Sequence, residues 1–192
     1  MRRRPWLDVV PLAASAGLVV GAGLWSSPLR RHVVVAPVAV IAAIAAGIAL
    51  IDARTRRVPN RAVVVASIVL FAGALAVTAL DHRPGTSTDA GIGLALYAVP
   101  LLVVNLRSPG GLGAGDVKLG VVLGGAAGLV HPLAAPLALA LGCVLALANR
   151  AFESTPRTTA QPFAPALVVA WCAVVVAMPG VVHALRLPWH YH

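Results

Sequence analysis

Acidic residues are scarce in this sequence, with only six Asp and Glu against 15 Lys and Arg in 192 residues. Charged residues make up 11% of the chain, whereas a soluble domain is usually about one quarter charged. Hydrophobic residues make up 59%, and the mean hydropathy is +0.90. This composition excludes an ordinary soluble protein and predicts an integral membrane protein. Because apolar stretches fill nearly the whole length, we expect one membrane-embedded domain over residues 1–192.

Cysteine and lysine are nearly absent. The two cysteines, Cys143 and Cys172, lie in apolar segments and form no CxxC pair. A structural zinc site needs about four closely spaced Cys or His ligands, so we expect no metal site and no cofactor. Lys118 is the single lysine, and the basic residues are not interleaved with aromatic side chains. Nucleic-acid binding is therefore not expected, and the positive charge is better explained by loops at one membrane face.

Seven apolar runs approach the length of about 20 residues that a helix needs to cross a bilayer. They cover residues 7–26, 33–51, 61–80, 90–105, 117–130, 133–149 and 163–184. The fifth and sixth runs meet at His131-Pro132, which is either a tight turn or a kink in one broken helix. The predicted fold class is therefore all-α, a polytopic transmembrane helix bundle with six or seven spans.

The distribution of basic residues predicts a cytoplasmic N-terminus. With that orientation the inside segments hold 11 of the 15 basic residues and the outside segments hold 4. The inside set is Arg2, Arg3, Arg4, Arg54, Arg56, Arg57, Arg61, Arg107, Lys118, Arg150 and Arg157. Cytoplasmic loops of membrane proteins are enriched in Lys and Arg, so the asymmetry supports this topology. Asp52 and Asp116 then lie at the cytoplasmic boundary, whereas Asp81 and Asp89 lie at the opposite one.

Asp52 and Asp116 each lie at the edge of an apolar run, where an ionisable side chain usually marks function. Asp52 closes the second run, and taken alone it is explained by pairing with Arg56 or Arg57. Asp116 follows the segment Gly113-Ala114-Gly115, whose glycines are expected to prevent a stable helix and to admit close backbone contacts. Taken alone, Asp116 is explained as a cap of the fifth helix.

Taken together, the two aspartates predict a catalytic pair, which neither of them predicts alone. Two carboxylates that share a proton are the minimum that aspartyl hydrolysis needs: the ionised one takes a proton from water, and the neutral one donates a hydrogen bond to the scissile carbonyl. At short distance their negative charges repel, so such a pair titrates as a unit. A pair of Asp residues without nearby His or Glu is, in contrast, a poor transition-metal site.

The two segments DARTRRVPN (residues 52–60) and GAGDVKLGVVLGGAAG (residues 113–128) resemble the type IV prepilin peptidases. In that family one aspartate precedes a basic stretch and a Pro-Asn or similar pair, and a second lies in a GxGD motif followed by a lysine, a leucine and spaced glycines. The resemblance covers about residues 40–150. The matching positions are Asp52, Pro59, Asn60, Gly113, Gly115, Asp116, Lys118, Leu119, Gly124 and Gly128.

The resemblance implies an aspartic endopeptidase of the cytoplasmic membrane, with its active site at the cytoplasmic face. It would remove the short basic leader that precedes the apolar helix of prepilin-like, Flp/Tad-type or pseudopilin substrates. Asp52 and Asp116 would be the catalytic dyad that activates water. The resemblance also implies residues that support the active-site loop and the substrate: Gly113, Gly115, Lys118, Pro59 and Asn60. The expected partners are therefore this substrate and membrane lipid.

One family feature is missing from the sequence. Longer members carry an N-terminal cytosolic region with CxxC motifs, which is associated with N-methylation of the cleaved product. This chain has no CxxC motif, so no methyltransferase activity is expected.

Two other classes of function remain open. In a proton- or cation-coupled transporter the two aspartates would carry ions, although such acids usually lie mid-span. In a non-catalytic subunit of a secretion system the motifs would persist without activity. Another GxGD-type intramembrane protease is the nearest enzymatic alternative, but Ile51 stands where that class has a tyrosine before the first aspartate.

Three residues near Asp116 have simpler structural explanations. Gly124 and Gly128 predict a close helix contact, and Lys118 is expected to reach the membrane interface.

Overall fold

A computed structural model describes residues 6–26, 32–81, 85–107, 112–152 and 163–185. Within these ranges the chain forms seven α-helices and no strand. The helices are α1 (Trp6–Trp25), α2 (His32–Thr55), α3 (Asn60–Asp81), α4 (Gly85–Arg107), α5 (Ala114–Val130), α6 (Ala134–Phe152) and α7 (Ala164–Ala184). The predicted loops at residues 27–31, 82–84, 108–111 and 153–162, and both chain ends, lie outside the described residues.

The helices form a polytopic membrane bundle, which confirms the predicted fold class. Five of the described helices, α2, α3, α4, α6 and α7, are long and apolar enough to cross a membrane. Each of the seven predicted runs corresponds to one helix. The largest difference in boundaries is at α4, which begins at Gly85 rather than at residue 90.

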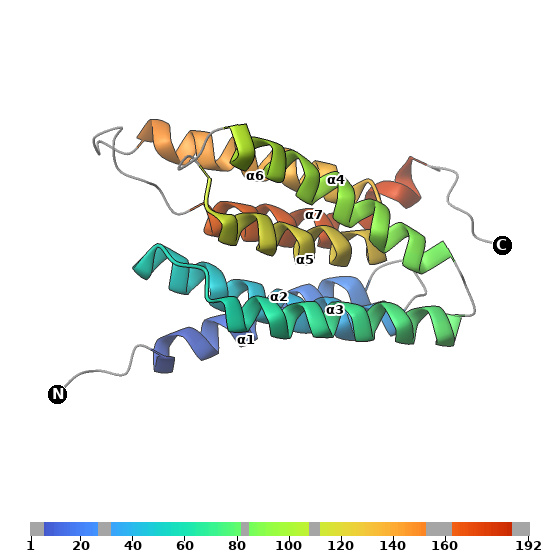
Figure 1. The fold of residues 1–192 in the computed structure, drawn as a ribbon. Coiled ribbons are helices and arrows are strands. Elements are labelled where there is room, and N and C mark those ends of the chain that lie inside the picture. Colours follow the sequence, from blue (N-terminus) through green and yellow to red (C-terminus); the bar gives the residue numbers. More distant parts are fainter. Residues whose placement is uncertain (1–5, 27–31, 82–84, 108–111, 153–162, 186–192) are drawn as a thin grey trace.

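The bundle has α5 at its centre. In Figure 1, α5 and α7 lie between α4 and α6 on one side and α1, α2 and α3 on the other. Among the described helices, α5 contacts every one except α1. Most of its residues from Asp116 to Val130 are buried. A helix that is apolar on all sides belongs in the interior of a bundle, and α5 has this composition.

A tight turn separates α5 from α6, so the two are not one broken helix. α5 ends at Val130, and the backbone N–H of His131 donates to the carbonyl of Ala127 at 2.8 Å. The backbone N–H of Ala134 donates to the carbonyl of His131 at 2.9 Å, and the Nδ1 atom of His131 accepts the N–H of Leu133 at 3.1 Å. These bonds satisfy polar groups that the ends of two adjacent helices would otherwise leave free.

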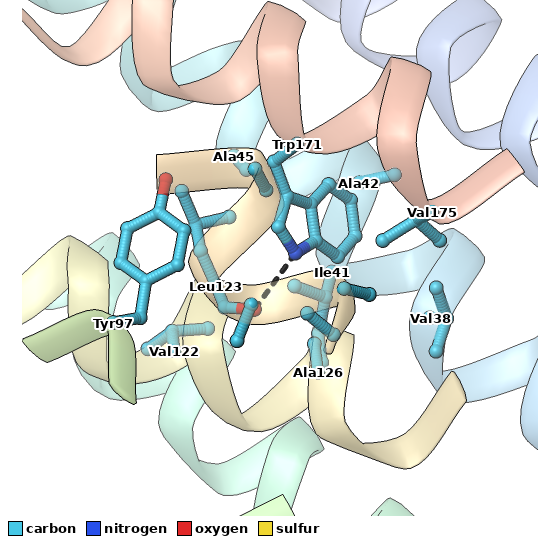
Figure 2. Close-up of a cluster of buried hydrophobic side chains, with 14 of the residues drawn as sticks. Val38, Ile41, Ala42, Ala45, Tyr97, Val122, Leu123, Ala126, Trp171 and Val175 are labelled. Carbon is cyan, nitrogen blue, oxygen red and sulfur yellow. Dashed lines mark hydrogen bonds between the residues drawn. The ribbon is translucent and has the colours of Figure 1, made fainter. Parts of the chain in front are cut away.

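A buried hydrogen bond connects α5 to α7 in the middle of the bundle. Trp171 of α7 is fully buried, and its Nε1–H donates to the Leu123 carbonyl at 2.7 Å (Figure 2). Tyr97 of α4, also fully buried, packs near Leu123 on α5 (Figure 2). An indole buried in apolar surroundings needs an acceptor for its N–H, and here the acceptor is backbone of the central helix.

Glycines allow α4 and α5 to approach each other closely. A Cβ atom on Gly124 would lie 2.5 Å from the Tyr97 Cβ and 2.7 Å from the Gly93 carbonyl oxygen. A Cβ on Gly128 would lie 2.8 Å from the Ala90 Cα. Real Cβ atoms do not occupy such positions, so only glycine fits. The close helix contact predicted for Gly124 and Gly128 is confirmed.

Successive helices run in opposite directions, which gathers three junctions at one end of the bundle. These are the ends of α2 and α3, of α4 and α5, and of α6 and α7 (Figure 1). Both conspicuous aspartates lie at this end, in α2 and α5. The α3–α4 junction, which carries Asp81, lies at the opposite end.

Candidate active site

Asp52 lies in the last turn of α2, with only 5% of its surface exposed. The sequence predicted that it would close the span, but α2 continues to Thr55. The helix ends there because Arg56 adopts a left-handed conformation (φ 53°) and its N–H donates to the Asp52 carbonyl at 2.7 Å. This is a common way for a helix to terminate. The side chains of Arg56 and Arg57 are exposed, so they do not share the buried surroundings of Asp52.

The first residue of α7 contacts the Asp52 carboxylate. The backbone N–H of Ala164 donates a hydrogen bond to it, and Ala164 is itself fully buried. The Oδ2 atom of Asp52 is buried and has no hydrogen-bond partner among the described residues. A buried oxygen of this kind usually has a functional explanation.

Asp116 lies in the first turn of α5, with 8% of its surface exposed. The sequence predicted that the glycines before it would prevent a helix, but α5 begins at Ala114 and includes Gly115. The backbone N–H of Asp116 donates to the Gly113 carbonyl at 3.0 Å. Its carboxylate in turn accepts the backbone N–H of Gly113, and a Cβ on Gly113 would lie 3.3 Å from the Asp116 Oδ2. This contact resembles one half of a capping box, but the N-cap residue of α5 is Gly113, and Asp116 lies in the first turn.

The fold brings the two carboxylates together, although the segments that carry them are distant in sequence. α2 and α5 pack against each other. Burial raises the pKa of the Asp116 carboxyl to about 6, and the negative charge of Asp52 contributes to the increase. The two carboxyl groups are therefore near enough for their charges to interact in surroundings with little water.

Two further contacts hold the beginning of α5 against the beginning of α3. A Cβ on Gly115 would lie 2.7 Å from the Val58 Cβ, so glycine is needed for the α2–α3 loop to pack here. The Lys118 Nζ donates to the Asn60 Oδ1 at 3.1 Å. Pro59 precedes α3, and its carbonyl accepts the N–H of Ala62 at 3.0 Å.

Two residues that make contacts at this end of the bundle were not singled out in the sequence. Asn105 of α4 donates through Nδ2 to the Leu112 carbonyl at 2.6 Å, which holds the chain just before Gly113. The other is Ala164, whose N–H donates to the Asp52 carboxylate. No cluster of three or more His, Cys, Asp or Glu suited to a metal ion occurs in the described part of the chain.

Comparison with known families decides the class of protein. The sequence profile of the type IV leader peptidase family matches residues 38–150. The chain belongs to this family. It is therefore a membrane protease of the leader-peptidase kind, a class whose substrates are prepilin-like proteins. The match contains Asp52 and Asp116 but ends before α7.

Comparisons with curated proteins and with solved structures give no significant match. The assignment to the family therefore depends on the profile match and on the geometry described above.

The raised pKa of Asp116 predicts that ionisation of this residue destabilises the fold. In the unfolded chain an aspartate ionises near pH 4, whereas in the fold Asp116 ionises near pH 6. The folded state thus binds the proton more tightly, and stability falls as the pH rises from about 4 to about 6, by about 3 kcal/mol. We expect Asp116→Asn to raise the midpoint of thermal unfolding in detergent at pH 7.5.

The same measurement at pH 4.5 is its control, because most of the loss of stability occurs above this pH. The difference between the melting temperatures of parent and variant should be clearly smaller at pH 4.5 than at pH 7.5. An equal difference between them at both pH values would contradict the prediction.

Proposed function

We propose that the protein is an aspartic endopeptidase in which Asp52 and Asp116 together activate a water molecule. The observation that carries this proposal is the convergence of two buried carboxylates, from α2 and α5, at one end of the bundle. The charge of one perturbs the titration of the other, as a dyad that shares one proton requires.

The chemistry follows from one proton shared between two acids. The ionised carboxylate removes a proton from water as the water oxygen attacks the scissile carbonyl carbon. The protonated carboxyl donates its proton to the carbonyl oxygen, which produces a tetrahedral diol. When the diol collapses, the C–N bond breaks, the leaving nitrogen takes a proton from one carboxyl group of the dyad, and the other carboxylate takes the proton of one diol hydroxyl. The products are a carboxylic acid and a free amine.

The proposed substrate is a prepilin-like protein with a short basic leader before an apolar helix. Family membership supports this class of substrate. The end of the bundle that carries the dyad is rich in basic residues among those described: Arg54, Arg56, Arg57, Arg61, Arg107, Lys118 and Arg150. The positive-inside rule supports a cytoplasmic position for this end, and we propose that the membrane is the inner membrane of the cell. Anionic lipid head groups attract both the basic leader and these side chains, so enzyme and leader meet at one surface.

The test is cleavage by the purified protein in liposomes. A prepilin-like substrate with its apolar helix should lose its leader, with the new N-terminus identified by mass spectrometry and expected to be unmethylated. A substrate with the same leader but without the apolar helix should be cleaved with a kcat/KM lower by roughly 10²-fold, because confinement in the bilayer raises its effective concentration. Absence of cleavage of either substrate would contradict the proposed function.

A further inference from the structure

The first turn of α7 contributes to the surroundings of the dyad although it lies outside the family match. The profile match ends at residue 150, whereas α7 begins at Ala164. The backbone N–H of Ala164 nevertheless donates to the Asp52 carboxylate. The first N–H groups of a helix have no partner within the helix and carry partial positive charge, so they favour an anion at this position.

A second observation at the same place points to a ligand. Only 5% of the surface of Asp52 is exposed, and its Oδ2 atom has no partner among the described residues. One carboxylate can accept several hydrogen bonds, so the bond from Ala164 leaves Oδ2 able to bind a water molecule. Asp116, from the beginning of α5, lies close to this carboxylate.

We propose that the Ala164 N–H is a positioning group of the active site, which orients the Asp52 carboxylate so that Oδ2 faces the hydrolytic water. The proposal rests on the function proposed above.

The surroundings of this bond support the positioning role. Ala164 is fully buried, and α7 packs against α2, so the donor and the carboxylate meet where there is little water. A preorganised hydrogen-bond donor has a larger effect in such surroundings than in water.

The sharpest test replaces the N–H group by an oxygen atom and changes nothing else. Replacing Ala164 by lactic acid, by nonsense suppression during cell-free synthesis into liposomes, converts this amide into an ester. Replacing Ala166 by lactic acid is the control, since it makes the same change in the same turn. We expect the ester at residue 164 to lower kcat for leader cleavage by about 10²-fold, the effect typical of a lost preorganised donor. KM and the unfolding midpoint should match those of the ester at residue 166.

Two results would overturn the inference. One is equal kcat for the two esters. The other is a loss at residue 164 that appears in KM or in the unfolding midpoint and not in kcat, since that would indicate a structural role. Neither result would affect the proposed function, because that proposal requires only cleavage by the parent protein and dependence on the carboxylates.

Discussion

Leader cleavage is expected to fall by at least about 10³-fold in Asp52→Asn and, separately, in Asp116→Asn. The amide has nearly the same shape as the carboxyl group, but it can neither accept the proton of water nor donate an acidic proton. Loss of one member of a proton-transferring pair removes the function of both, and general acid–base catalysis alone contributes about 10²–10⁴-fold. The measurement is kcat/KM for the prepilin-like substrate, with protein amount and unfolding midpoint compared across the variants.

The double variant provides a further test of shared function. If the two carboxylates act as one unit, Asp52→Asn with Asp116→Asn should cost no more than either single change, because residues that act together have non-additive effects. Asp81→Asn is the control, since Asp81 is the last residue of α3 and lies at the opposite end of the bundle. It should cleave at the parent rate. Activity retained in either single variant would rule out the dyad.

The same variants distinguish peptidase from transporter. A transporter that uses these acids would lose proton or cation flux in both variants, and the parent would cleave no leader. The position of both carboxylates at one end of the bundle supports the peptidase, because ion pathways usually place acids near the middle of the membrane.

The positions of Asp52 and Asp116 could be predicted at the level of topology. The lengths of the apolar runs determine how often the chain crosses the bundle, and two crossings, α3 and α4, separate the end of α2 from the beginning of α5. Both ends must then lie at the same side. Packing of α2 directly against α5 could not be predicted, because apolar runs of similar composition do not specify which helix becomes the central one.

Contacts made by backbone were the hardest to predict. The N–H of Ala164 acts without any distinctive side chain, and the segment before it has no pattern that defines where α7 begins relative to α2. The bond between Lys118 and Asn60 was missed for a different reason. Each residue has an ordinary explanation by itself, in lipid contact or helix capping, and only the packing of α3 beside α5 brings them together.

The largest expected effect on stability comes from adding one methyl group to the contact between α4 and α5. In Gly128→Ala the new Cβ would overlap the Asp89 carbonyl oxygen and approach the Ala90 Cα at 2.8 Å. Both are backbone atoms of α4, which cannot rotate away as a side chain would, so the helices must separate. Overpacking of a tight core costs about 1–3 kcal/mol, and this contact belongs at the upper end of that range. We expect the unfolding midpoint in detergent to fall by roughly 5–10 °C.

Gly91→Ala is the matched control because Gly91 is also helical and lies on α4, but a Cβ there would meet no atom within 4 Å. Alanine favours a helix over glycine by about 1 kcal/mol, so this variant should melt at or above the parent temperature. Gly124→Ala should behave like Gly128→Ala, since its Cβ would approach the Gly93 carbonyl oxygen at 2.7 Å. Equal midpoints for Gly128→Ala and Gly91→Ala would show that α4 and α5 are not in close contact. The position of Asp116 would then be in doubt as well, because α5 carries it to the dyad.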